Sequence, residues 1–331
     1  MMNNKKFTRY FLLLVFVALN VVIIINYSMD PYWTFKHSNM LNNKQIDFDE
    51  RQQKTNYLHF VNNNFDSLLL GSSRSTYFKE YHFDNKLFNY AANGMYPYEY
   101  EYFINTFEHL TGNTAKQIIL GVDFFGSNKN KNKKPVQQIY LETTLSPMYK
   151  YNLLINYNIF KYSLQNIKQN IFIKKPFYDR KRVKSIKKIN NLPLQIKKTV
   201  SYIQGYEYDS DLKGYWQNLQ NNFANSQFIV FTTPVTMSQL KAYREVGLMP
   251  FYFQWLRDLV EAFGSITDFM ALNSYTMDYN NFFDANHFTP AFADLLAKEL
   301  VNKEDKIGIT LDKTNIDAYI KELEQKINAL E

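Results

Sequence analysis

Short runs rich in apolar residues recur along the chain, bounded by polar or turn residues, and the leucines of Ser67–Gly71 form an uninterrupted one. Five of them have the length of strands: Ser67–Gly71, Lys86–Gly94, Gln117–Phe125, Gln227–Pro234 and Ser265–Met270. Runs that do not alternate with polar residues are typical of strands buried on both faces of a parallel sheet. The pattern therefore predicts five strands that pair side by side in one parallel sheet.

Helical spacing of apolar residues separates or follows these runs. It covers Tyr98–Leu110, Met249–Phe263 and Ala291–Val301, the last with Thr289 as the expected N-cap and Pro290 as the first helical residue. Strands that alternate with helices form parallel sheets with right-handed crossovers. We therefore expect an α/β fold, a parallel five-stranded sheet flanked by helices. A last amphipathic helix has Ile316, Tyr319, Ile320, Leu323 and Ile327 on one face, and we expect it to dock on its own domain.

The middle of the chain breaks this alternation. Residues 127–226 show no clear strand and are too long for a plain loop, so we expect a mostly helical insertion. Between Lys129 and Lys198 there are 17 Lys or Arg residues and two acids, although the net charge of the whole chain is only +7. Such a basic segment fits anionic lipid headgroups or an anionic polymer, and it fits a solvated helical surface equally well.

The N-terminus predicts a membrane anchor. Lys5, Lys6 and Arg9 precede an apolar run from Tyr10 to Tyr27, which has the length of a membrane span. The positive-inside rule places the N-terminus in the cytoplasm and the rest of the chain outside. A cleaved signal peptide is the rival interpretation, but residues 26–31 make a poor cleavage site, which favours a retained signal anchor.

These patterns divide the chain into five parts. We expect a cytoplasmic N-terminus with the transmembrane helix at 1–29, a stalk and approach helix at 30–63, a catalytic domain at 64–126 and 227–303, the basic insertion at 127–226, and a C-terminal amphipathic helix at 304–331. The chain has no cysteine, which excludes disulfides, thiolate metal sites and a cysteine nucleophile. No motif requires a metal or a cofactor, so neither is expected.

The first predicted strand ends in Gly71-Ser72-Ser73. A serine at this point lies at the carboxyl edge of the sheet, where open α/β folds place their ligands. Gly and Ser are also common turn residues, so the stretch by itself fits an ordinary strand-to-loop turn.

A second candidate is the pair Asp284 and His287. In an Asp-x-x-His turn the carboxylate can hold one imidazole nitrogen and leave the other to accept a proton from a serine, which is otherwise a weak nucleophile. The alternative is a local cap ahead of the Pro290 helix. The other histidines, at positions 37, 59, 82 and 109, have no such setting.

The order of these stretches resembles the SGNH/GDSL hydrolase superfamily, over about residues 67–125 and 227–300. The family's first block is Gly-Asp-Ser after strand one. It matches Gly71-Ser72-Ser73, which implies Ser73 as the nucleophile and a serine in place of the family's aspartate. The second block matches Asn89–Gly94 and implies an oxyanion hole made by the backbone N–H groups of Ser73 and Gly94. The final block, Asp-x-x-His, implies Asp284 and His287 as the remaining triad members.

The third block departs from the family. The family has Gly-x-Asn-Asp, whose Asn donates to the oxyanion, whereas here the stretch is Gly121-Val122-Asp123-Phe124. An ionised Asp123 only accepts hydrogen bonds and would repel an oxyanion, and losing one such donor costs roughly 10²–10³ in rate. Asn93, Asn128 and Arg74 are candidate substitutes. Asp123 alternatively orients Arg74 or caps a helix.

The resemblance favours one branch of the superfamily. With its predicted membrane anchor and large insert, the chain resembles one group of membrane-anchored members. These are the envelope acyl-transfer proteins of alginate O-acetylation and teichoic-acid D-alanylation. This implies a bacterial, extracytoplasmic, single-pass membrane acyltransferase or esterase that acts on an envelope polysaccharide, the acyl group being O-acetyl in the first case. A membrane-bound O-acyltransferase would be its donor partner, and nucleic acid is not expected.

Two other interpretations remain open. A non-catalytic envelope scaffold on the same fold would bind polymer or a membrane partner through the basic insertion, and both Ser72 and Asp123 favour it. A lipid esterase facing the cytoplasm would use the apolar N-terminus as a hook, but the basic flank at Lys5, Lys6 and Arg9 argues against it.

Overall fold

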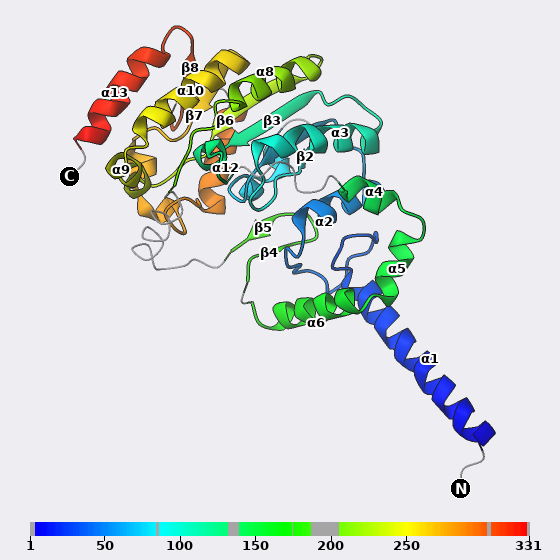
Figure 1. Ribbon diagram of the computed structural model, residues 1–331. Coiled ribbons are helices and arrows are strands. Elements are labelled where there is room, and N and C mark those ends of the chain that lie inside the picture. Colours follow the sequence, from blue (N-terminus) through cyan, green and yellow to red (C-terminus); the bar gives the residue numbers. More distant parts are fainter. Residues whose placement is uncertain are drawn as a thin grey trace. The chain divides into compact units, whose positions relative to one another are not determined.

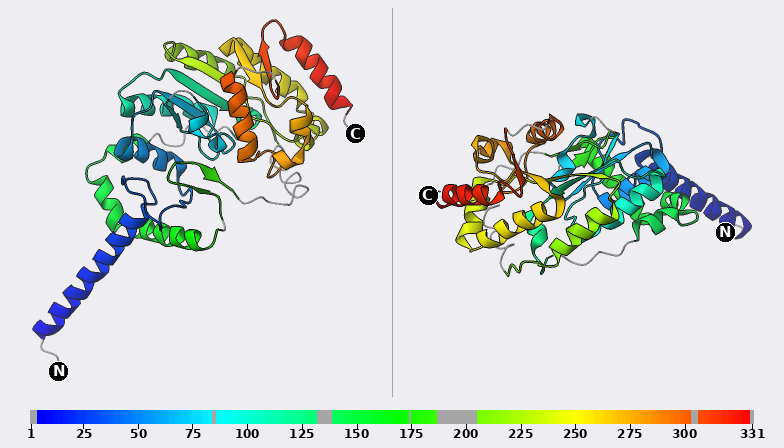
Figure 2. Two further views of the ribbon diagram at one scale, coloured as in Figure 1. Left: turned by 180° about the vertical axis from the view of Figure 1, so that it is seen from behind. Right: turned by 90° about the horizontal axis from the view of Figure 1, so that it is seen from above.

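The computed structural model describes residues 4–83, 86–131, 139–173, 175–186, 205–302 and 306–329. Its chain forms two compact units (Figures 1 and 2). The helical unit consists of Met1–Asn63 and Ile139–Lys187, and the sheet unit of Asn64–Gln138 and Lys188–Glu331. The segment expected to be a stalk, 30–63, thus belongs to the same unit as 139–187 of the predicted insertion. Residues 132–138, 174 and 187–204 of that insertion lie outside the described residues.

A six-stranded sheet forms the centre of the sheet unit. Its strands are β1 (Ser67–Gly71), β2 (Leu87–Asn89), β3 (Gln117–Val122), β6 (Gln227–Thr232), β7 (Ser265–Asp268) and β8 (Ile309–Asp312). The order is β2-β1-β3-β6-β7-β8. The first five strands are parallel, as predicted, and follow one of the common doubly wound orders. The five-strand count was wrong, because β8 pairs antiparallel with β7 and extends the edge.

Helices cover the two faces of this sheet. They are α3 (Tyr100–Thr111), α8 (Leu212–Asn222), α9 (Met237–Glu245), α10 (Met249–Phe263), α11 (Ser274–Met277), α12 (Pro290–Asn302) and α13 (Ile316–Asn328). The predicted N-cap is confirmed, since the N–H of Phe292 donates to Thr289 Oγ1 at 3.2 Å. The predicted apolar face of α13 is buried against α9 and α10, so this helix docks on its own unit.

The helical unit begins with α1 (Asn4–Met29), which is long and apolar enough to cross a membrane. The other helices of the unit are α2 (Glu50–Asn56), its π-helical continuation Tyr57–Val61, α4 (Tyr140–Leu145), α5 (Tyr149–Ile155) and α6 (Tyr157–Ile171). The prediction that 127–226 holds no strand was wrong, because β4 (Phe177–Tyr178) and β5 (Lys184–Ser185) form a short antiparallel ribbon. Each strand has only two residues, too few for a periodic signal.

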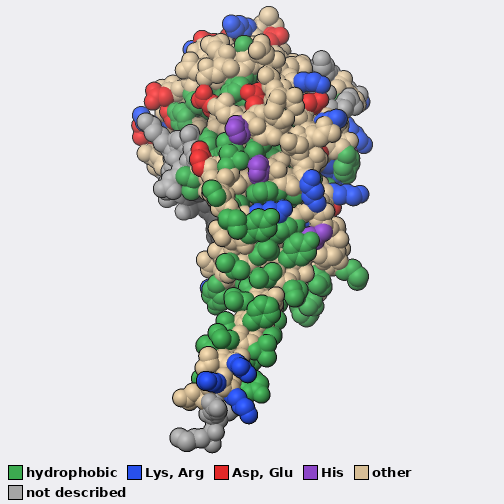
Figure 3. All heavy atoms as spheres, turned by 90° about the vertical axis from the view of Figure 1, so that its right-hand side faces the viewer, with side chains coloured by type: hydrophobic (Ala, Val, Ile, Leu, Met, Phe, Trp, Pro, Cys, Tyr) green, Lys and Arg blue, Asp and Glu red, His purple; other side chains and the backbone are tan. Residues whose placement is uncertain are grey.

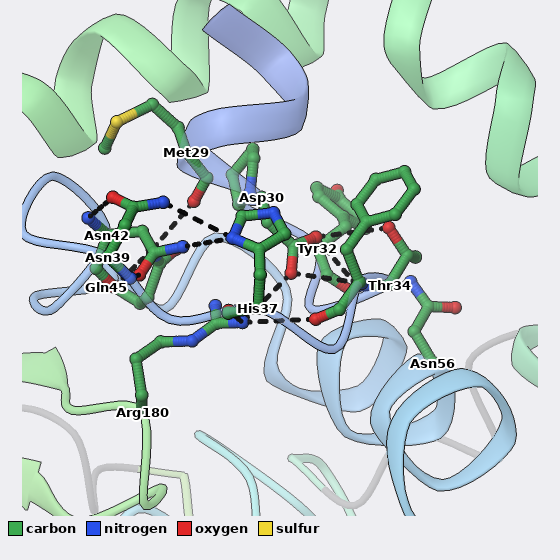
Figure 4. A network of polar contacts seen from close by, with 12 residues as sticks. Met29, Asp30, Tyr32, Thr34, His37, Asn39, Asn42, Gln45, Asn56 and Arg180 are labelled. Atoms are coloured by element: carbon green, nitrogen blue, oxygen red, sulfur yellow. Dashed lines mark hydrogen bonds and ion pairs between the residues drawn. The ribbon is translucent and has the colours of Figure 1, made fainter. Parts of the chain in front are cut away.

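A polar network lies where α1 meets the rest of the helical unit (Figure 4). The carboxylate of Asp30 accepts hydrogen bonds from the N–H of Thr34 at 2.8 Å and from that of Phe35 at 3.2 Å, and it pairs with Arg180 at 3.1 Å. The turn bends sharply, since Asp30 and Trp33 both have positive φ angles, 43° and 55°. The segment after α1 is therefore held by buried polar contacts.

Candidate active site

The turn after β1 depends on two glycines that face each other in the sheet. Gly71 pairs with Gly121 of the neighbouring strand β3, and a Cβ at either position would overlap the hydroxyl of Ser75. Gly71 also has a φ of 153°, which side chains rarely adopt. The two glycines thus make room for Ser75, which begins the short 3₁₀ helix Ser75–Tyr77 (η2). This compact turn presents Ser73 at the carboxyl edge of the sheet.

Ser73 forms a hydrogen-bonded chain with two residues from the other end of the sequence. Its Oγ lies 2.8 Å from His287 Nε2. His287 Nδ1 lies 2.9 Å from one carboxylate oxygen of Asp284 and 3.0 Å from the other. The structure thus brings together the three residues that the sequence placed in one triad. In this arrangement Asp284 can hold the imidazole with a proton on Nδ1, which leaves Nε2 to accept the serine proton.

The loop that carries Asp284 and His287 is pinned by its own backbone. Phe283 donates its N–H to the carbonyl of His287 at 2.8 Å, and Phe282 and Phe288 form a bridge. Phe282, Phe283 and Phe288 are all buried. Apolar side chains of this loop therefore anchor it in the core, while the imidazole stays about one third exposed, at 30%.

Electrostatics keep Asp284 ionised. Burial opposes the charged form, but the hydrogen bond and charge of His287, together with the backbone N–H groups of Asn286 and His287, outweigh burial and hold the pKa of Asp284 below its ordinary value. Both N–H groups donate to Oδ1, at 3.0 and 2.8 Å. The carboxylate is thus fixed by three donors and cannot easily rotate away from the imidazole.

The Asn93-Gly94 turn is tied to the end of β1. Ala92 donates its N–H to the carbonyl of Gly71 at 3.0 Å, and Met95 closes the turn by donating to Ala92 at 3.1 Å. Gly94 is exposed with a φ of 57°. Within the described part of the chain, neither the N–H of Ser73 nor that of Gly94 donates to another residue. Both expected oxyanion donors are therefore available to a ligand.

Asp123 pairs with Arg74 inside the protein. Arg74 Nη1 lies 2.8 Å from Asp123 Oδ1 and 3.0 Å from Thr233 Oγ1, and the hydroxyl of Thr233 donates to the same carboxylate oxygen. The side chains of Arg74 and Asp123 are each 4% exposed. Asp123 makes no side-chain cap of the short helix after it. Of the two alternative roles, orienting Arg74 is the one that the contacts show.

Asn128, another candidate donor, holds neighbouring backbone through its side-chain oxygen, whereas an oxyanion would be bound by its Nδ2. Its Oδ1 accepts from the backbone N–H groups of Asn130 and Glu207, at 3.1 and 3.3 Å. Asn93 is exposed.

Thr233 was missed by the sequence reasoning. It follows β6 at the carboxyl edge of the sheet, so the rule that identified Ser73 could have identified Thr233 as well.

No group of three or more His, Cys, Asp or Glu side chains is placed to hold a metal ion among the residues that the structure describes. His82 of the sheet unit also has a carboxylate partner, since it lies 2.9 Å from Asp294. Lys79 contacts the same carboxylate, and Ser73 is not part of this cluster.

No protein-family model matches the chain, and no curated protein matches it either. Any functional assignment therefore rests on the geometry of the site and on the motifs that form it.

Proposed function

We propose that the protein is a membrane-anchored acyltransferase or esterase of the SGNH type. The observation that carries the proposal is the hydrogen-bonded chain Ser73–His287–Asp284 at the carboxyl edge of a parallel sheet. The parallel order of the first five strands and the position of the Asn93-Gly94 turn support it further. This combination fits nucleophilic catalysis by serine, because it supplies a base, an orienting carboxylate and unpaired N–H donors together.

The first half of the reaction forms an acyl-enzyme. Ser73 Oγ attacks the acyl carbonyl carbon while its proton passes to His287 Nε2. The N–H groups of Ser73 and Gly94 stabilise the negative charge on the carbonyl oxygen. The bond to the leaving group then breaks, and the proton on His287 passes to the leaving oxygen.

The second half returns the enzyme to its starting state. A sugar hydroxyl or a water molecule gives its proton to His287 and attacks the acyl-serine. The ester bond to Ser73 breaks, the proton returns to Ser73 Oγ, and the acyl group leaves on the acceptor. The same triad serves both acceptors, so transfer and hydrolysis differ only in which hydroxyl reaches the acyl-enzyme.

The Arg74–Asp123 pair partly offsets the absence of the family's oxyanion-binding asparagine. A bare carboxylate at Asp123 would oppose an oxyanion, but the buried guanidinium 2.8 Å away compensates its charge. The pair supplies no carboxamide donor in place of the asparagine of the family. We therefore expect simple esters to react slowly.

The apolar helix α1 supports a location at the membrane. With basic residues before it, the sheet unit would lie on the extracytoplasmic side. We propose an envelope polysaccharide as the acyl acceptor, O-acetyl as the acyl group and a membrane-bound O-acyltransferase as the donor partner. These three assignments rest on the resemblance to the SGNH branch described above. Protease digestion of intact cells tests the topology: the sheet unit should be cleaved from outside.

Acyl release from a chromogenic acetyl ester tests the activity. Full-length wild type in detergent should release the chromophore, a glycan acceptor should raise the rate and carry the acetyl group, and Ser73→Ala should do neither. Ser72→Ala is the matched control, since it removes the neighbouring hydroxyl. Equal release by wild type and Ser73→Ala would contradict the proposal. A folded wild type without release would point to the non-catalytic scaffold.

A further inference from the structure

Helix α6 buries several polar side chains and exposes several large apolar ones, although it also buries Ile159 and exposes Asn158, Gln165 and two lysines. Its inward side chains include Ser163, Asn166 and Gln169, all buried. Its outward stripe is Tyr157, Lys161, Leu164, Lys168 and Ile171, spaced four, three, four and three residues apart. Of these, Tyr157 is 67% exposed and Ile171 66%. Helices at a water-facing surface carry mostly polar residues on the outer side, so the large apolar side chains that α6 exposes need an explanation.

The buried polar side chains are used in hydrogen bonds. Asn166 donates to Gln45 Oε1 at 2.7 Å and accepts from the N–H of Ile46 at 2.9 Å. Ser163 donates to Asn26 Oδ1 at 3.0 Å. These contacts fix the rotation of α6 about its own axis. The apolar stripe therefore faces outward because the inner contacts require it to.

The apolar surface extends beyond α6. The residues just after the helix, Phe172 and Ile173, are 59% and 47% exposed. Three further residues on or next to α5 are also exposed, Met148, Tyr151 and Ile155. We call these residues and the outward stripe of α6 the apolar face. Its size and its aromatic content distinguish it from the scattered exposed hydrophobic residues that any protein carries.

The apolar face is continuous with α1. Helix α1 packs against both α5 and α6, and Figures 1 and 2 show α6 on the side of the helical unit from which α1 emerges. In Figure 3, hydrophobic side chains continue from α1 onto the adjoining surface, and Lys and Arg side chains lie at its border. If α1 crosses a bilayer, the apolar face lies where the bilayer surface begins.

The positive charge of this region favours an anionic bilayer. The stripe of α6 contains Lys161 and Lys168, and there is no Asp or Glu from Tyr149 to Tyr178. Lys161 Nζ lies 4.5 Å above the ring centre of Tyr157, so its ammonium group stays close to the apolar surface. Lysines among aromatic and aliphatic residues are typical of helices that lie in the interface of an anionic membrane.

We propose that α5, α6 and the residues after them form an interfacial platform that lies on the surface of an anionic bilayer. The platform rests on the membrane anchoring in the proposed function, but not on catalysis. It would insert its apolar side chains to a depth of about 5–10 Å, with the lysines at the phosphate groups. It would hold the helical unit against the membrane at a second place besides α1.

Site-specific labelling can test this directly, because the chain has no cysteine of its own. Leu164→Cys and Ile171→Cys, each in the full-length protein, are labelled with an environment-sensitive fluorophore. The protein is reconstituted into vesicles of phosphatidylcholine and phosphatidylglycerol that contain lipids brominated near the headgroup. Leu295→Cys is the matched control, since that leucine is 41% exposed in the sheet unit, against 44% for Leu164. Leu14→Cys reports whether α1 is in the bilayer.

The proposal predicts loss of fluorescence and a blue-shifted emission for labels at positions 164 and 171, and neither change at 295. Replacing phosphatidylglycerol by phosphatidylcholine, or combining Lys161→Glu with Lys168→Glu, should weaken the quenching. The proposal would be overturned if the label at position 14 is quenched while the labels at 164 and 171 are quenched no more than the label at 295. An unquenched label at position 14 would remove its premise and overturn it as well.

A partner protein is the competing occupant. In that case the unlabelled cysteine of Leu164→Cys would react with a water-soluble thiol reagent in vesicles and be protected only in native membranes, which would also overturn the proposal. Reaction of Ser73 with a fluorophosphonate is measured in the same vesicles. Quenching without reaction of Ser73 would refute the catalytic function and support the platform. Reaction of Ser73 without quenching would refute the platform and support the catalytic function.

Discussion

The three leucines of β1 in the sheet unit are fully buried, and Ser73 follows just after the end of this strand. In the helical unit, Asn166 and Ser163 of α6 are buried and Tyr157 and Ile171 are exposed. Strand β1 of the sheet unit has the apolar side chains expected inside a protein in water, and the proposed reaction would take place at its carboxyl end. The exposed apolar side chains of α6 in the helical unit fit the position next to a bilayer that we propose. If the proposed function is right, the comparison separates polar residues that serve a reaction from polar residues that hold a fold together.

The sharpest test of this difference is Asp284→Asn. An asparagine keeps the shape of the side chain but favours the wrong imidazole tautomer, so acyl transfer should fall by roughly 10²–10⁴-fold. The free energy of unfolding should change by no more than about 1 kcal/mol, because the loop is held by buried phenylalanines. Ester release and urea unfolding of the same sample measure both. Large destabilisation would mean that Asp284 holds the fold and not the reaction.

Substituting buried polar residues of the helical unit should instead lower the free energy of unfolding. Lys184 is buried and lies 2.7 Å from Glu50, which also accepts from the hydroxyl of Tyr178. Lys184→Met should lower the free energy of unfolding by about 3–5 kcal/mol, since it removes one partner of a buried pair. Urea unfolding followed by circular dichroism measures the change.

The matched control for Lys184 is Lys326→Met in the sheet unit. Lys326 also pairs with a glutamate, Glu322, at 2.6 Å, but this pair is exposed. Its loss should cost at most about 0.5 kcal/mol. Equal effects of the two substitutions would mean that the buried contacts of Lys184 contribute no more to stability than an exposed ion pair.

The next effect concerns the glycines beneath the site. Gly121→Ala should destabilise the sheet unit by about 1–3 kcal/mol, because the added Cβ overlaps the Ser75 hydroxyl and would lie 2.8 Å from Phe231 Cζ. Gly214→Ala in α8 is the control. It has open space around it and should stabilise the protein by about 0.4–1 kcal/mol. A neutral Gly121→Ala would show that the turn tolerates a side chain.

The smallest effect is a dependence on pH. The pKa of Asp284 lies below its ordinary value of 3.8 in the folded protein, so its ionised form stabilises the fold. This contribution is fully present above pH 3.8 and is lost as the pH falls through the lowered folded-state pKa. The difference in Tm between wild type and Asp284→Asn should therefore shrink as the pH drops below about 4. A difference that grows on acidification would mean that the sign is reversed.

Residues of the sheet unit were largely predictable because local patterns determine them. The apolar spacing predicted α10 at Met249–Phe263, which are its observed ends, and the order of three short motifs placed Ser73, Asp284 and His287 together. The edge strand β8 was not predicted as part of the sheet. It has only four residues, and its antiparallel pairing with β7 depends on the chain returning after α12.

The helical unit was not predictable by the same reasoning. It joins Asn26 to Ser163, 137 residues apart, through a hydrogen bond that leaves no trace in local spacing. The rule that apolar residues mark the core fails for most buried positions of α6, because Ser163, Asn166 and Gln169 are buried there beside Ile159. The expected stalk and part of the expected insertion therefore belong to one unit, together with α1.

The central claim is that Ser73 is the nucleophile, and covalent capture tests it most directly. Full-length protein is treated with a fluorophosphonate, digested, and analysed by mass spectrometry. The account predicts one adduct on Ser73, its loss in Ser73→Ala, much slower formation in His287→Ala, and normal formation in Ser72→Ala. An adduct on another serine, or equal labelling of wild type and Ser73→Ala, would contradict it.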